Sequence, residues 1–176
     1  DDYRIAIIYT DIKYFKYIND TLGYQRGDML LKEFTSQVTE GNIHMLCAAR
    51  VFSDNIVMAS RLENDISNEQ FREFIHQHNL KMEERFREKY LAARLKFCTG
   101  ISFISKEDRR LDPATAVSNA NLARKAAKEQ KDDCCVLFDS KMVEGIKKEI
   151  EITSSLTKAI ENGELKVYYQ PKMETE

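Results

Sequence analysis

The sequence predicts an α/β (α+β) layered sandwich in which helices flank a mixed, largely antiparallel central sheet. Short β-branched and aromatic runs alternate with amphipathic helical patterns along most of the chain. Two of the short runs are separated only by a polar turn, which is typical of an antiparallel hairpin. The chain has 176 residues, of which 43% are hydrophobic, and only two prolines. This is enough to bury a core in one domain of ordinary size plus an extension.

The first apolar run ends at a carboxylate. Residues 5–9 predict a buried strand, which places Asp11 at its C-terminal end. Ligands of α/β sheets bind beside the carboxyl ends of strands, where a carboxylate can hold a hard cation and backbone N–H groups can hold phosphate. Further along, Asn19 and Asp28 carry donors and acceptors that could read a base edge. The same residues also fit the end of one short helix and the start of the next.

A helix and a hairpin follow. Residues 25–40 place apolar side chains at helical spacing, with Gly41 as the candidate C-cap. Residues 43–51 and 56–60 predict a β-hairpin with Asp54 at the tip of its turn. Ordinary turn chemistry also explains Asp54, because serine, aspartate and asparagine bond to their own backbone.

The next helix begins with a recognisable cap. Ser67 and Gln70 form a capping box in front of a long amphipathic helix. His78 lies near its apolar stripe, where a packing role is a better interpretation than a metal site. Residues 95–104 then predict a strand, in which Gly100 marks a bulge or a close approach.

The last part of the domain is a helix and a short strand. Asp112 and Pro113 begin a helix that ends near residue 130, because proline is well placed at the first helical position. Residues 134–138 predict a short strand, and residues 140–161 predict a further helix.

Composition excludes some classes of partner. A net charge of −2 gives no basic field, so no nucleic-acid partner is expected. No apolar run approaches the roughly 18 to 20 residues that span a bilayer, and no signal peptide opens the chain. We expect a cytoplasmic domain without membrane contact of its own, with membrane attachment upstream left open. The four cysteines, which we expect to be reduced core thiols, are Cys47, Cys98, Cys134 and Cys135.

One long string carries a family resemblance. Residues 11–28 read D-I-K-Y-F-K-Y-I-N-D-T-L-G-Y-Q-R-G-D. This resembles the opening signature of the GGDEF domain, the diguanylate cyclase fold, which commonly reads D-x-D-x-F-K-x-I-N-D-x-x-G-H-x-x-G-D. The resemblance covers residues 4 to about 138 and implies a nucleotide-cyclase, palm-like fold. In that family two subunits each bind one GTP, and metal-assisted attack of each 3′-hydroxyl on the other α-phosphate gives cyclic di-GMP and two pyrophosphates.

The resemblance implies a set of site residues. The ligands of Mg²⁺ or Mn²⁺ would be Asp11, the backbone carbonyl of Ile12, and Asp54, which also matches a catalytic carboxylate. Asn19 and Asp28 match the residues that read guanine. The other nucleotide-binding positions are the triphosphate turn and a lysine of a later helix, namely Lys13, Tyr14, Phe15, Lys16 and Lys128.

The chain departs from the family at several of these places. The hairpin commonly reads R-x-G-G-D-E-F, whereas residues 50–56 read R-V-F-S-D-N-I. Phe52 and Ser53 replace glycines that let the backbone approach the nucleotide, and we expect the ring of Phe52 to fill that space. Lys13 replaces the second acidic residue of D-x-D. Asp132 replaces a phosphate-binding arginine, which sets a like charge near phosphate.

A second, shorter resemblance lies at the end of the chain. Residues 156–174, LTKAIENGELKVYYQPKME, resemble the entry to an EAL domain, the cyclic di-GMP phosphodiesterase module. The expected organisation is a degenerate GGDEF domain over 1–138, a linking helix over 139–162 and the first strand of a truncated EAL domain over 163–176.

Three functions remain open. The favoured one is a degenerate GGDEF domain that regulates a C-terminal EAL domain of the same protein and binds GTP or another guanine nucleotide, with Mg²⁺ or Mn²⁺ if nucleotide is bound. The alternative is an active diguanylate cyclase, which the survival of Asp11, Asp54 and Lys128 supports. The third is a scaffold or homodimerisation module that binds no nucleotide.

Overall fold

The computed structural model describes residues 3–40, 44–90, 95–104, 112–130 and 134–171. Two positions singled out above, Gly41 and Asp132, lie outside these residues. The chain divides into two compact units, Asp1–Phe138 and Asp139–Glu176, and each is described by itself.

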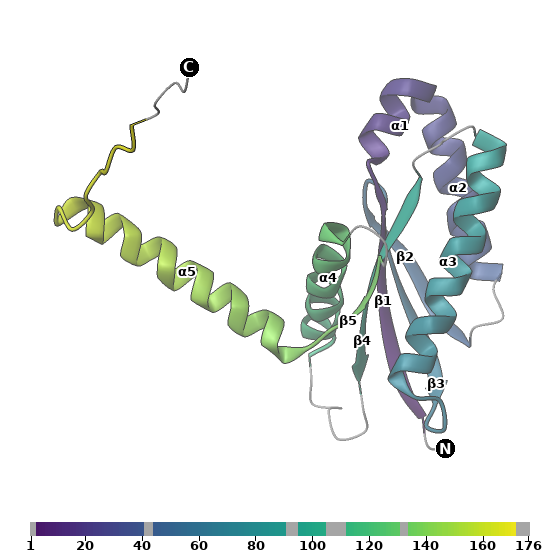
Figure 1. The fold of residues 1–176 in the computed structure, drawn as a ribbon. Helices are drawn as coiled ribbons and strands as arrows, with labels where there is room; N and C mark the ends of the chain where they lie inside the picture. Colours follow the sequence, from purple (N-terminus) through teal and green to yellow (C-terminus); the bar gives the residue numbers. More distant parts are fainter. Residues whose placement is uncertain (1–2, 41–43, 91–94, 105–111, 131–133, 172–176) are drawn as a thin grey trace. The chain divides into compact units, whose positions relative to one another are not determined.

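The first unit is built on one five-stranded sheet in the order β2-β3-β1-β4-β5 (Figure 1). The central strand β1 pairs antiparallel with β3 and β4, β2 pairs antiparallel with β3, and β4 and β5 are parallel. The predicted mixed, largely antiparallel sheet is therefore confirmed. The strands are β1 (Tyr3–Lys13), β2 (Met45–Phe52), β3 (Asn55–Glu63), β4 (Lys96–Ile104) and β5 (Cys135–Leu137).

Helices cover both faces of this sheet. Helices α2 and α3 lie on one face and α4 lies on the other, while α1 follows the C-terminal end of β1 (Figure 1). Side chains alternate along a strand, so Ile8 and Ile12 of β1 pack in the main core, whereas Ile7 and Tyr9 pack with α4. The helices are α1 (Phe15–Leu22), α2 (Tyr24–Glu40), α3 (Asn68–Tyr90) and α4 (Pro113–Glu129). By this alternation, Asp11 falls on the α4 face.

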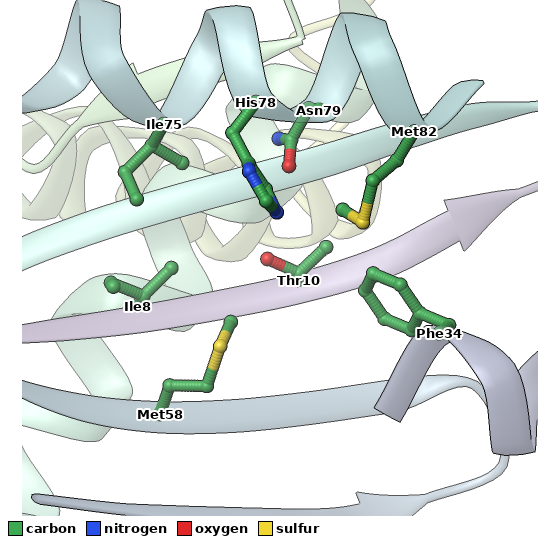
Figure 2. A pocket seen from close by; sticks show the side chains of 8 residues that line it. All are labelled: Ile8, Thr10, Phe34, Met58, Ile75, His78, Asn79 and Met82. Atoms are coloured by element: carbon green, nitrogen blue, oxygen red, sulfur yellow. The ribbon is translucent and has the colours of Figure 1, made fainter. Parts of the chain in front are cut away.

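The main core contains a small internal cavity between α3 and the sheet (Figure 2). Its volume of about 20 Å³ is close to that of one water molecule, so it is a packing feature rather than a ligand site. Two of its polar lining residues bond to the buried Thr99: Asn79 Nδ2 donates to Thr99 Oγ1 at 2.9 Å, and Thr10 Oγ1 lies 2.9 Å from Thr99 Oγ1. The half-buried His78 side chain also lines this cavity, in agreement with its predicted packing role.

Several local signals in the sequence have the structure that they predicted. Ser67 Oγ accepts from the Gln70 N–H at 3.1 Å, and Gln70 Oε1 accepts from the Ser67 N–H at 2.8 Å, which completes the capping box. Asp112 caps α4 by accepting from the Ala114 N–H at 3.3 Å, with Pro113 as the first helical residue.

The prediction of a buried thiol at Cys47 is wrong. Cys98, Cys134 and Cys135 are buried as expected, but Cys47 is exposed. The physical reason is its place in β2, an edge strand in which six of eight residues are exposed. An apolar run at the edge of a sheet has fewer neighbours to bury it than the same run at the centre.

Within its described residues, the second unit contains one helix, α5 (Ser140–Glu161), within the bounds that the sequence predicted. Asp139 caps it, since its side chain accepts from the Lys141 N–H at 2.9 Å. Residues 164–171 have no regular secondary structure. The strand expected over 163–176 stays a prediction, because a strand is defined by its hydrogen bonds to a neighbour.

Among the residues that the structure describes, no helix is both long and apolar enough to cross a bilayer.

Candidate functional site

A pocket of about 530 Å³ lies at the C-terminal end of β1. The end of β1, the start of α1 and α2, the hairpin turn and the end of α4 all contribute to its walls. Its volume is in the range of small-molecule sites. The lining residues are Ile12, Tyr14, Phe15, Lys16, Asn19, Tyr24, Ser53, Asp54 and Lys128. Most of the predicted site residues are therefore brought together here.

The turn from β1 into α1 forms one wall of this pocket. Tyr14 adopts a left-handed conformation with φ 62° and ψ 29°, which reverses the chain between the strand and the helix. After this turn, Phe15 is buried and Lys16 is exposed. Lys13 is not among the lining residues, because its Nζ donates to the Gln130 carbonyl at 3.1 Å, just beyond the end of α4.

Asp11 is the most buried charged group at the site, with 1% of its surface exposed. Its Oδ2 accepts from Lys128 Nζ at 2.7 Å and from Arg124 Nη1. The two cations are four residues apart, so they lie on the same face of α4. Arg124 is held in place by Asn121 Oδ1, 2.9 Å from its Nε, and by the ring of Tyr9, 5.3 Å from the guanidinium carbon.

Gly100 allows α4 to lie this close to the sheet. A Cβ at this position would lie 2.1 Å from the Ala120 carbonyl oxygen and 2.1 Å from the Arg124 backbone nitrogen. Real Cβ atoms do not approach backbone so closely, so only glycine fits. The predicted close approach at Gly100 is confirmed, and it is what places Arg124 over Asp11.

The hairpin turn contributes the second carboxylate. Asp54 Oδ2 accepts from the Ile12 N–H at 3.1 Å, which ties the turn to the end of β1. Ser53 has φ 50°, a left-handed conformation that glycine adopts more easily. The expectation that the ring of Phe52 fills the nucleotide space is wrong, because this side chain is 76% exposed and does not line the pocket. Phe52 is paired with Asn55 at the turn end of the edge strand β2, so its ring is left open to solvent.

Asn19 and Asp28, the two predicted base readers, differ in the structure. Asn19 lines the pocket, and its Oδ1 is buried without a hydrogen-bond partner among the described residues. Gly27 packs against it so closely that a Cβ there would lie 1.8 Å from this oxygen. Asp28 is exposed on α2 and is not among the lining residues.

The donor set fits a hard divalent cation poorly. Asp11 Oδ1 is buried and lacks a partner, which would favour a metal, but Oδ2 of the same carboxylate already accepts from two cations. Mg²⁺ and Mn²⁺ favour sites with several oxygen ligands and little competing positive charge. Within the described ranges, no group of three or more histidine, cysteine, aspartate and glutamate side chains could hold a metal ion. The Mg²⁺ or Mn²⁺ that the resemblance implies therefore does not fit Asp11, Ile12 and Asp54 as they lie.

A pair of buried thiols lies beside Asp11. Cys98 is paired with Asp11 across β1 and β4, and it packs with Cys134 and Ala127. A hydrogen bond between the two thiols raises the pKa of Cys98 and lowers the pKa of Cys134. This cluster supports the end of α4 one residue before Lys128.

Arg124 is the residue beside the candidate site to which the sequence did not point. The resemblance pointed to Lys128 alone. The signal that could have found Arg124 is its spacing of four residues from Lys128 on a predicted helix.

Comparison with known proteins gives a consistent family. The family model "Diguanylate cyclase, GGDEF domain" matches residues 1–134. Among curated proteins, the chain is similar to the bifunctional diguanylate cyclase/cyclic di-GMP phosphodiesterase MucR of Pseudomonas aeruginosa, at 24% identity over 98% of this chain and 24% of the relative. It is also similar to the cyclic di-GMP phosphodiesterase PdeR of Escherichia coli, at 23% identity over 98% of this chain and 25% of the relative. The chain spans about a quarter of the length of these relatives.

Solved structures show the same fold. The active GGEEF domain of a diguanylate cyclase from Vibrio cholerae has a TM-score of 0.60 at 23% identity, covering 78% of this chain and 84% of that one. The GGDEF domain of DgcB from Caulobacter crescentus, in complex with c-di-GMP, has a TM-score of 0.62 at 18% identity, covering 77% and 78%. The expected nucleotide-cyclase, palm-like fold is therefore confirmed.

Proposed function

We propose, since this chain belongs to the GGDEF family of diguanylate cyclase domains, that it is a regulatory domain which binds a guanine nucleotide and makes little or no cyclic di-GMP. One observation carries the proposal: Asn19 lines a pocket of about 530 Å³ and its buried Oδ1 has no partner among the described residues, while Asp11 nearby is already bound by two cations of α4. The pocket is suited to bind a ligand, but the carboxylate of Asp11, which contacts the lining residue Lys128, is engaged within the protein.

The base-reading half rests on Asn19. A buried oxygen without a partner costs free energy, and a ligand N–H that donates to it recovers that cost. Guanine offers such donors on its Watson–Crick edge, so Asn19 is proposed to read the base. Asp28, exposed on the neighbouring helix, is proposed to contribute from the rim of the pocket.

The phosphate-binding half rests on lysines. Lys16 and Lys128 both line the pocket, where Asp54 is the only carboxylate among the lining residues. This balance of charge favours an anionic ligand. Tyr14 and Phe15 shape the turn beneath it, and Lys13 adds positive charge at the end of α4.

The loss of cyclase activity follows from the carboxylates. The family reaction needs acidic side chains that hold metal against the phosphates. Here Asp11 is paired with Arg124 and Lys128, and Asp54 accepts from the Ile12 N–H. Asp54 is therefore proposed to be a vestige of a catalytic position that now ties the hairpin to β1.

Calorimetric titration tests the binding half of this proposal. We expect GTP to bind the chain more tightly than ATP, because a wrong base leaves Asn19 unpaired. Equal binding of both nucleotides, or no binding at millimolar concentration, would replace this proposal with the scaffold function.

Product detection tests the second half. After long incubation with GTP and Mg²⁺ or Mn²⁺, chromatography should find no more cyclic di-GMP with the wild type than with Asp54→Ala. Turnover well above this control would show an active cyclase instead.

We further propose that residues 1–138 regulate an EAL phosphodiesterase domain that begins near residue 163, joined by the helix over 139–162. The Y-Y-Q-P string at residues 168–171 and the two curated relatives named above, both described as phosphodiesterases, support this organisation. In a longer protein that contains the EAL domain, GTP should change the rate of cyclic di-GMP hydrolysis. Asn19→Ala should remove that response and leave the basal rate unchanged.

A further inference from the structure

At Asp11, the positive charge that a metal ion would supply comes from side chains of the protein. We propose that Arg124 and Lys128 take the place of a divalent cation at Asp11, so that the pocket binds an anionic ligand without Mg²⁺ or Mn²⁺. The exclusion of metal from Asp11 stands on the contacts of this side chain alone. The metal-free binding of nucleotide rests, in addition, on the proposed function.

The first step of the argument is charge balance. The Asp11 side chain is 2% exposed and the Arg124 side chain 10%, so this ion pair is almost removed from water. A buried carboxylate needs a cation to compensate for its lost hydration, and the charge of Arg124 is by itself sufficient for this. Lys128 adds a second positive charge to the same oxygen at 2.7 Å. Asp11 is thus fully compensated before any ligand arrives.

The second step is that Arg124 is fixed where it lies. Asn121 Oδ1 accepts from its Nε at 2.9 Å, the Tyr9 ring lies under its guanidinium, and Gly100 provides the room for its backbone. The positive charge of a guanidinium is permanent in proteins. A metal at Asp11 would therefore have to approach a permanent positive charge that cannot lose a proton or move aside easily.

The third step separates the roles of the two cations. Arg124 is buried against Asp11 and does not line the pocket, whereas Lys128 is 44% exposed and does line it. Lys128 is thus placed between the carboxylate and the space for a ligand. We assign it to an anionic group of the ligand, together with Lys16, while Arg124 compensates the negative charge of Asp11.

Direct binding of Mn²⁺ to the nucleotide-free chain tests the exclusion of metal. Electron paramagnetic resonance should find no Mn²⁺ site that depends on Asp11. The wild type and Asp11→Asn should therefore bind Mn²⁺ alike. Arg124→Met, checked for folding by circular dichroism, should gain Mn²⁺ affinity by about tenfold or more, a change of about 1.4 kcal/mol. Lys125→Met, which removes an exposed charge from the same helix, should not gain it.

Three outcomes of this arm would overturn the proposal. One is a micromolar Mn²⁺ site in the wild type that Asp11→Asn abolishes. Another is a folded Arg124→Met variant with no gain in Mn²⁺ affinity, because Arg124 would then not be the cause of the exclusion. The third is an equal gain in Lys125→Met, which would reduce the effect to net charge. Should Arg124→Met fail to fold, the comparison of wild type with Asp11→Asn decides alone.

Titration of GTP in EDTA and in Mg²⁺ tests the nucleotide half. The wild-type Kd should agree within about threefold between the two conditions, since the metal adds little where protein cations already bind the anion. A larger loss of affinity in EDTA would overturn metal-free binding. Absence of GTP binding in both conditions would count against the proposed function only, because the Mn²⁺ measurement uses no nucleotide.

Discussion

Two regions beside the pocket differ in how their buried polar side chains are paired. On the α1–α2 side, formed by Asn19 and Gly27, a buried amide oxygen has no partner among the described residues. On the β1–α4 side, formed by Asp11, Arg124 and Lys128, Asp11 Oδ2 accepts from two cations, and only Oδ1 has no partner among the described residues. Buried polar groups are normally paired, so the Asn19 oxygen can gain a bond from a ligand, whereas the charge of Asp11 is already compensated within the fold.

This difference separates recognition from chemistry within one site. The unpartnered Asn19 costs the folded protein about 1 to 3 kcal/mol, which a ligand donor would recover. Removing a partner from a buried ion pair would instead cost stability, because a charge would be left uncompensated. The α1–α2 side should therefore respond to mutation mainly in binding, and the β1–α4 side mainly in stability.

The largest expected effect is the loss of stability in Gly100→Ala, in which the new side chain displaces the backbone of α4 on the β1–α4 side. The new Cβ would meet α4 backbone atoms at 2.1 Å, so the helix that carries Arg124 and Lys128 has to move. We expect a loss of about 3 kcal/mol or more in the free energy of unfolding, at the upper end of overpacking effects. Urea denaturation measures it. Gly145→Ala in α5, where a Cβ meets no atom within 4 Å, is the matched control and should be neutral or slightly stabilising.

The next largest effect is the coupling between Asp11 and Arg124, which a double-mutant cycle measures. Arg124→Met should lower the free energy of unfolding by about 2 to 3 kcal/mol, less than for an isolated buried pair because Lys128 remains. Asp11→Asn in the Arg124→Met background should return part of that loss, since the uncompensated charge is gone. Denaturation of the four proteins gives the coupling. Additive changes would show that the two side chains do not interact, and the comparison would fail on this side.

A smaller effect on folding, but a clear one on binding, is expected for Asn19→Ala. The variant should bind GTP more weakly by about 1 to 3 kcal/mol and lose its preference over ATP, while its free energy of unfolding stays level or rises. Asp28→Ala should weaken GTP less, because its side chain is exposed outside the pocket lining. Calorimetry and urea denaturation of the same samples separate the two quantities. A destabilised Asn19→Ala protein would mean that Asn19 is bound within the fold after all.

The smallest effect concerns thiol reactivity, which reports whether the β1–α4 side is closed. Cys98 and Cys134 pack with Ala127 beneath the end of α4, whereas Cys47 is exposed on β2. Native protein should therefore label rapidly at Cys47 and slowly at the other two, as mass spectrometry of the labelled peptides would show. Cys47→Ser should remove the rapid phase. Equal rates at all three would mean that this side opens readily.

Most of the fold could be predicted because its signals are local. The capping box at Ser67 and the first helical proline at Pro113 act within one helical turn, so the sequence alone places both helix starts. Cys47 could not be placed in this way. Its apolar run is indistinguishable from a core strand until the strand order puts β2 at the edge of the sheet.

The features of the candidate site also divide into those that local sequence predicted and those that depend on tertiary packing. The motif over residues 11–28 predicted the pocket and the position of Asn19 within it, because β1, α1 and α2 follow one another along the chain. The direction of Phe52 and the exposure of Asp28 depend on packing between separate elements, and the sequence did not predict them.

The sequence by itself determined that an aspartate ends the first strand and that a helix carrying Lys128 comes late in the domain. Only the tertiary structure decided what Asp11 binds. Its partner Arg124 is 113 residues away, and it reaches Asp11 because β4 pairs with β1 and Gly100 admits α4 to that face. Local propensities cannot encode such a contact, since it depends on strand register and helix packing together. The balance of charge at the site, and with it the proposed chemistry, is a property of the folded chain.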